Sequence, residues 1–201
     1  MGQEVNDMKK SILLITAVCA ASCALSACGK KKVNAYDNLN SMVEASYSQV
    51  TISVNNTFTQ EDVTLESVYT LIYNKDQVTV QYKVERFNDG LSLDSPDTDV
   101  KTTLSGTAVI VGDSVTGGND VGLTADIASL SFEFKEEYFA NVTIGESQLT
   151  ADVTNTSGFL GTKLTCTNMK VNAQFSDVFE SITITYKQGL NEVEYSYIFT
   201  R

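Results

Sequence analysis

Alternation of apolar and polar residues runs through most of the chain after residue 50 and predicts a β-sheet. In a β-strand, successive side chains point to opposite faces, so a period of two gives the strand one apolar face. Short turns separate neighbouring segments, which is typical of an antiparallel meander. The clearest segments have an apolar residue at every second position: 78–84, 169–175, 182–186 and 193–199.

One segment before the strands has a helical period instead. Leu39, Met42, Val43 and Tyr47 recur at spacings of three and four and predict a helix over 35–49. A one-sided sheet needs a cover, and this helix is the best candidate for it. The fold class we expect is mainly β (α+β): one globular domain over 35–201, with an N-terminal helix packed on a curved, half-barrel-like antiparallel meander. A β-sandwich is the alternative.

The first residues have the pattern of an export signal. Lys9 and Lys10 form a short basic region, and an apolar run follows from 12 to 24. This run is shorter than the roughly 20 residues that a membrane-spanning helix requires, but it has the length of a secretory signal. The run leads into Leu25-Ser26-Ala27-Cys28.

These four residues resemble the lipobox of bacterial lipoproteins, in which an aliphatic residue and two small residues precede a cysteine. The resemblance covers residues 8–28 and implies a signal peptide over 1–27 and a lipidated tether over 28–34. It implies that Cys28 carries a diacylglyceryl group, which binds the protein to the outer face of the bacterial cell membrane, or to the outer membrane of a Gram-negative cell. An ordinary secretory signal and an uncleaved anchor helix are the alternatives.

The order of the predicted elements suggests a second and looser resemblance. One N-terminal helix followed by a long antiparallel sheet is similar to the half-barrel of the LolA-like and LppX-like lipoprotein carriers. The resemblance is one of element order, without shared signature residues. It implies a concave sheet face that could hold a lipid or another apolar ligand.

Charge excludes one class of partner. Residues 33–201 contain nine basic and 23 acidic residues, a net charge of −14. Such a domain repels phosphate backbones, so we expect no nucleic-acid partner. Anionic head groups are repelled as well, so contact with the membrane is expected to depend on Cys28.

Candidate catalytic chemistry is sparse. The chain has no His, which removes Ser-His and Cys-His nucleophile pairs and the usual transition-metal ligands. Asp94, Asp97 and Asp99 crowd one segment and are a weak Ca²⁺ candidate, but a solvated acidic loop is the favoured interpretation. Cys166 has no candidate base near it in the sequence, and we interpret it as an inert thiol. We therefore predict no catalytic residue, no cofactor and no enzymatic activity.

Aromatic residues on the predicted inward faces are the remaining candidates for a site. They could line a cavity for an apolar ligand, although packing in the core is the favoured interpretation. We expect a monomeric, non-catalytic binding or interaction domain. An accessory protein of the cell envelope that acts through protein contacts is the alternative, and a carboxylate-based hydrolase is a more remote one. The candidate lining residues are Tyr69, Tyr82, Tyr195, Tyr197 and Phe199.

Overall fold

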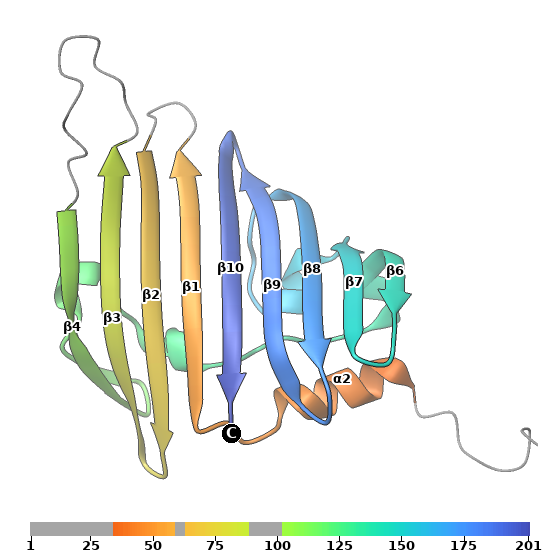
Figure 1. Cartoon of the computed structure of the whole chain (residues 1–201), viewed down its shortest axis with the longest axis horizontal. Coiled ribbons are helices and arrows are strands. Elements are labelled where there is room, and N and C mark those ends of the chain that lie inside the picture. Colours follow the sequence, from red (N-terminus) through yellow and green to blue (C-terminus); the bar gives the residue numbers. More distant parts are fainter. Residues whose placement is uncertain (1–33, 59–62, 89–101) are drawn as a thin grey trace, which may run out of the picture. The chain divides into compact units, whose positions relative to one another are not determined.

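Ten antiparallel strands form one open sheet in the computed structural model, which describes residues 34–58, 63–88 and 102–201 (Figure 1). The mainly β prediction is confirmed, and a single sheet replaces the sandwich alternative. The lipobox lies outside the described residues. The strands are β1 (Gln49–Phe58), β2 (Val63–Asn74), β3 (Gln77–Asn88), β4 (Thr102–Val111), β5 (Ser114–Thr116), β6 (Phe139–Ile144), β7 (Gln148–Val153), β8 (Thr167–Phe175), β9 (Phe179–Gln188) and β10 (Asn191–Thr200).

The sheet consists of two meanders that meet at its centre. Strand order is β5-β4-β3-β2-β1-β10-β9-β8-β7-β6, so the first and last strands of the chain are neighbours. The β1–β10 pair runs from Gln49↔Thr200 to Thr57↔Glu192. Because β5 and β6 end up at opposite edges, the segment between them must cross one face of the sheet. We call this segment, residues 117–138, the crossing connection.

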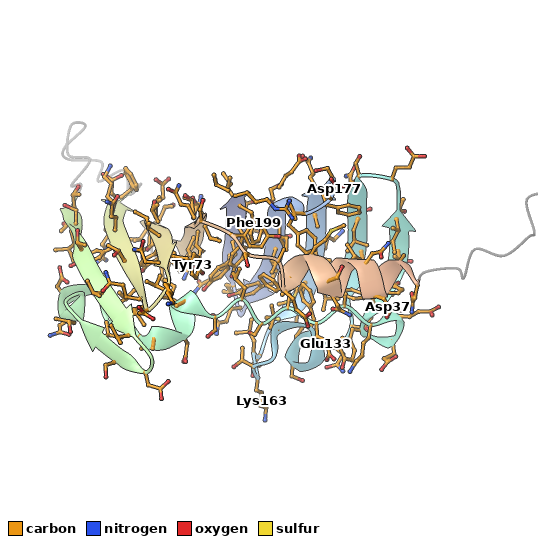
Figure 2. The ribbon with its side chains drawn as sticks, turned by 90° about the horizontal axis from the view of Figure 1, so that it is seen from below. Asp37, Tyr73, Glu133, Lys163, Asp177 and Phe199 are labelled. Carbon is orange, nitrogen blue, oxygen red and sulfur yellow. The ribbon has the colours of Figure 1, made fainter. Side chains whose placement is uncertain are left out.

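The crossing connection and two α-helices cover the apolar face (Figures 1 and 2). The connection has no long regular element and contains three short 3-10 helices. Within β1, β2, β7 and β8, all buried residues lie an even number of positions apart, which shows that each of these strands has one covered face. The helical elements are α2 (Ala35–Val43), α3 (Thr156–Leu160), η1 (Asn119–Val121), η2 (Ala125–Ala128) and η3 (Glu136–Tyr138).

The core beneath α2 is built from phenylalanines. Phe134 and Phe159 are fully buried, and their ring centroids lie 5.4 Å apart at 69°, an edge-to-face contact. Phe134 also lies 6.0 Å from the ring of Phe139 and 5.7 Å from that of Phe179. The connection, β6, α3 and β9 each contribute one of these rings, so the cluster joins four elements that are distant in sequence.

The predicted helix ends earlier than its apolar period suggests. It stops at Val43 rather than near residue 49. Tyr47 belongs to the turn that follows, where its hydroxyl donates to the Met42 carbonyl oxygen at 2.7 Å and its ring packs 4.8 Å from Phe199. The apolar side chains after Val43 are thus used to anchor a turn and to start β1.

Asn40 fastens α2 to the crossing connection through two hydrogen bonds. Its Nδ2 donates to the carbonyl oxygen of Phe134 at 2.9 Å, and its Oδ1 accepts from the Phe134 amide at 2.7 Å. Phe134 therefore has both backbone groups satisfied although it belongs to no strand. The irregular segment around Phe134 is thus held in place by a side chain of α2.

Replacing Asn40 with Ala is expected to lower the free energy of unfolding by about 1–3 kcal/mol, because it leaves a part-buried amide and carbonyl of Phe134 without partners. Urea unfolding followed by circular dichroism measures this. Asn38→Ala, on the exposed side of the same helix, is the control and is expected to change the stability by less than about 0.5 kcal/mol. Equal losses of stability in the two variants would contradict a stabilising role of the two Asn40–Phe134 hydrogen bonds.

Candidate functional site

A cleft of about 560 Å³ lies between the sheet and the crossing connection. Its floor is formed by β1, β2, β9 and β10, which supply Ile52, Tyr69, Ile184 and Tyr195 among others. One wall is residues 121–132 of the connection, and the opposite wall is residues 160–164, which follow α3. The cleft exists because an irregular segment, rather than a long helix, covers this part of the sheet.

Stacked tyrosines form the floor of the cleft. Tyr186 and Tyr195 have ring centroids 6.2 Å apart at 16°, and Tyr195 and Tyr197 are 6.3 Å apart at 17°. Tyr195 and Tyr197 are two residues apart on β10, while Tyr186 lies on β9, where it pairs with Val193. The edge of Phe132 meets the face of Tyr197 at 5.1 Å. This tyrosine row is the most specific chemical feature of the cleft.

Burial raises the pKa of two phenols in the tyrosine row, Tyr186 and Tyr197. The neighbouring Tyr195 raises the pKa of Tyr186 further through a hydrogen bond and charge repulsion. A neutral phenol presents an apolar ring and a hydroxyl that can donate or accept one hydrogen bond. The floor can therefore contact hydrocarbon and still satisfy an isolated polar group.

These raised pKa values predict a loss of stability in alkali. The folded state binds the phenol protons more tightly than the unfolded state does, so their contribution is complete below about pH 10 and is lost as the pH rises above it. Each group contributes a slope of at most about 1.4 kcal/mol per pH unit. Urea unfolding between pH 8 and 11 measures the slope. Tyr197→Phe is expected to reduce it, and an unchanged slope in this variant would contradict the assignment.

Two other tyrosines hold the wall of the cleft in place. The Tyr73 hydroxyl donates to the Ala128 carbonyl oxygen at 3.3 Å, and the Tyr82 hydroxyl donates to Asp120 Oδ1 at 2.8 Å. Tyr82 lies over Gly106 on the adjacent β4, where its ring leaves no room for a Cβ. Sequence analysis placed Tyr82 in the candidate lining, whereas the structure uses its hydroxyl to position η1.

The predicted lining residues are divided between the cleft and the core. Tyr69, Tyr195 and Tyr197 line the cleft. Phe199 is not among the lining residues and packs against Tyr47 and Phe179. The weak calcium candidate, Asp94, Asp97 and Asp99, and the lipidation site, Cys28, lie outside the described residues.

Several lining residues were not predicted from sequence. Leu123, Ile127 and Leu164 belong to irregular segments with no period that could reveal which side chains face inward. Lys163 is the one basic residue among those that line the cleft, and its side chain extends away from the sheet into solvent (Figure 2). Asp126 lies on the opposite wall. The apolar floor therefore has a polar rim.

A second hollow, of about 900 Å³, is lined differently. Four of its five charged residues pair with one another: Lys187 Nζ lies 2.7 Å from Glu192 Oε1, and Lys170 Nζ lies 3.8 Å from Asp152 Oδ1. Asn141 Nδ2 also donates to Asp152 Oδ2 at 2.6 Å. The larger hollow thus offers mostly internally paired groups to a ligand, and we consider the tyrosine cleft the better candidate.

Other reactive groups in the described part of the chain do not form a centre. Those residues contain no group of three carboxylates or thiols that could hold a metal ion. Cys166 is half-buried, and burial raises the pKa of its thiol, which makes the thiolate less accessible. No helix within the described ranges is long and apolar enough to cross a membrane.

Comparisons with known proteins do not assign the chain to a family: no family model, curated protein or solved structure matches it.

Proposed function

We propose that this chain is a membrane-anchored, extracytoplasmic lipoprotein whose domain binds one small apolar or amphiphilic ligand in the tyrosine cleft, without catalysis. The proposal has two parts, a cellular location and a binding site. The location rests on the lipobox resemblance that ends at Cys28. The single observation that carries the binding role is the cleft with its row of stacked tyrosines.

The size of the cleft supports a ligand of one chain or one ring system. Small-molecule pockets typically enclose about 300–1,000 Å³, and this cleft has about 560 Å³. Aliphatic and aromatic side chains line most of it. Polar side chains come from the floor at Ser67 and from the two walls: Thr124, Asp126, Ser129, Ser131, Thr162 and Lys163. Such a lining favours an amphiphile whose apolar part lies on the tyrosines and whose polar end reaches the rim.

Filling the cleft tests this role. Val54 and Val68 lie on neighbouring strands, but Val54 lines the cleft, whereas Val68 points to the opposite face and is 38% exposed. We expect Val54→Trp to weaken binding of the fluorescent fatty acid cis-parinaric acid at least tenfold. Val68→Trp is the control and is expected to bind as the parent does. Similar affinities for the two variants, or no binding by the parent, would contradict the proposal.

A further inference from the structure

One polar side chain in the floor of the tyrosine cleft has no partner in the described part of the protein. Ser67 lies on β2, lines the cleft and is only 7% exposed. Its hydroxyl makes no hydrogen bond with a side chain or backbone group of the described residues. Buried polar side chains in folded proteins are almost always hydrogen-bonded, so an exception needs an explanation. Ser67 is therefore an open hydrogen-bonding position inside the cleft.

The strands on either side of Ser67 do not supply the missing partner. Its neighbour on β1 is Val54 and its neighbour on β3 is Val84, and both side chains are apolar. The backbone groups of these strands are paired with each other in the sheet. A ligand that covers Ser67 thus either bonds the hydroxyl or leaves it buried without a partner, which costs free energy.

Ser67 stands at one end of a row of side chains that crosses four strands. It pairs with Val54, Val54 pairs with Tyr195, and Tyr195 pairs with Ile184. All four residues line the cleft. With a spacing of about 4.8 Å between neighbouring strands, the row spans about 14 Å, which suits a chain of about ten carbons. The hydrocarbon of a ligand can therefore lie across the strands with one end on Ser67.

The charged residues nearest to Ser67 favour no ion at this position. Arg86 pairs with Leu65, two residues before Ser67, so it lies on the same face of the sheet. Asp126 lies on the wall that the crossing connection forms. These two residues are exposed and opposite in sign. A desolvated ion on the floor would need a closely paired countercharge, whereas an uncharged oxygen needs only a hydrogen bond.

We infer that the ligand of the tyrosine cleft carries an uncharged oxygen, a hydroxyl or a carbonyl, at the end of its apolar part, and that this oxygen bonds the Ser67 hydroxyl. The inference rests on the proposed function, because it names the chemistry of a ligand of the same cleft. A serine hydroxyl both donates and accepts, so it can bond either kind of oxygen. Ser67 thereby selects against chains that end in plain hydrocarbon, which would cover the hydroxyl without bonding it.

Two ten-carbon acids test this inference by displacing cis-parinaric acid from the purified full chain. 10-Hydroxydecanoic acid has an oxygen at the far end of its chain, and decanoic acid has none there. Their carboxylates are the same, so the ratio of the two affinities reports the terminal oxygen. We expect Ser67→Ala to lower this ratio at least fivefold, because the oxygenated chain loses its partner and the plain chain no longer buries an unpaired hydroxyl.

Matched serine variants and a third acid complete the experiment. Ser67→Thr retains the hydroxyl and is expected to keep the parental ratio. Ser53→Ala removes a hydroxyl from β1 beside Val68, on the opposite face of the sheet, and is expected to leave the ratio unchanged. Binding of decanoic acid by Ser67→Ala shows that this variant is folded. 9-Oxodecanoic acid, compared with decanoic acid in the same way, shows whether Ser67 also bonds a carbonyl.

The outcomes separate this inference from the proposed function. If both oxygenated acids kept their parental ratios to decanoic acid in Ser67→Ala, the inference would be overturned while the cleft remained a binding site. An equal fall of the ratio in Ser53→Ala would overturn it as well, and so would failure of both oxygenated acids to displace bound cis-parinaric acid. No binding of cis-parinaric acid by the parent would contradict the proposed function itself.

Discussion

Replacing Cys28 with Ser is expected to move the protein from the membrane fraction to the soluble fraction almost completely. Each buried methylene of an acyl chain contributes roughly 0.8 kcal/mol to membrane binding, so two chains anchor stably whereas one holds only marginally. The part of the chain that the structure describes offers no replacement. The net charge of −14 over residues 33–201 disfavours an anionic surface, and no described helix could span the bilayer. Cell fractionation together with metabolic labelling by an alkyne fatty acid measures both consequences.

Two other cysteines, Cys23 and Cys166, serve as controls for Cys28. Cys23 follows Ala20-Ala21-Ser22 and is a weaker lipobox match, so Cys23→Ser is expected to retain both label and membrane binding. Cys166→Ser, in the folded domain, is expected to do the same. If Cys28→Ser kept the label and partitioned as the parent does, the lipoprotein assignment would be wrong.

The second large effect is expected in the phenylalanine core. Phe134→Ala removes a fully buried ring that contacts Phe139, Phe159 and Phe179. Loss of the ring and the cavity it leaves are expected to lower the free energy of unfolding by about 3–5 kcal/mol. Urea unfolding followed by tyrosine fluorescence and circular dichroism measures the loss.

An exposed apolar position on β6 provides the comparison. Val142 is 36% exposed, and Val142→Ala is expected to change stability by less than about 0.5 kcal/mol. A loss below about 1 kcal/mol for Phe134→Ala would mean that the crossing connection is not part of the cooperative core. The cleft wall could then not be treated as a fixed structure.

Sequence patterns were sufficient for the strands but not for their arrangement. The period of two in 78–84, 169–175, 182–186 and 193–199 is local, and these segments lie within β3, β8, β9 and β10. The pairing of β1 with β10 joins residues that are 135 to 151 positions apart, and no local pattern encodes such a neighbour. That pairing is what forces the crossing connection, and therefore the cleft, to exist.

The candidate site was predictable only on its sheet side. Tyr69, Tyr195 and Tyr197 lie at inward positions of strands, so their period indicated where they point. Tyr82 lies at an equivalent inward position and pairs with Tyr69, yet its hydroxyl donates a hydrogen bond to Asp120. The opposite wall comes from irregular chain, where the contacts that orient each side chain are tertiary.

Native mass spectrometry of the full chain, purified from the cells that naturally produce it, tests the binding role most directly. The account predicts a population carrying one additional small apolar molecule per protein. It also predicts that this molecule is lost in Val54→Trp and retained in Val68→Trp. Repeated preparations of the folded parent without any bound molecule, or with the same molecule retained in Val54→Trp, would contradict it.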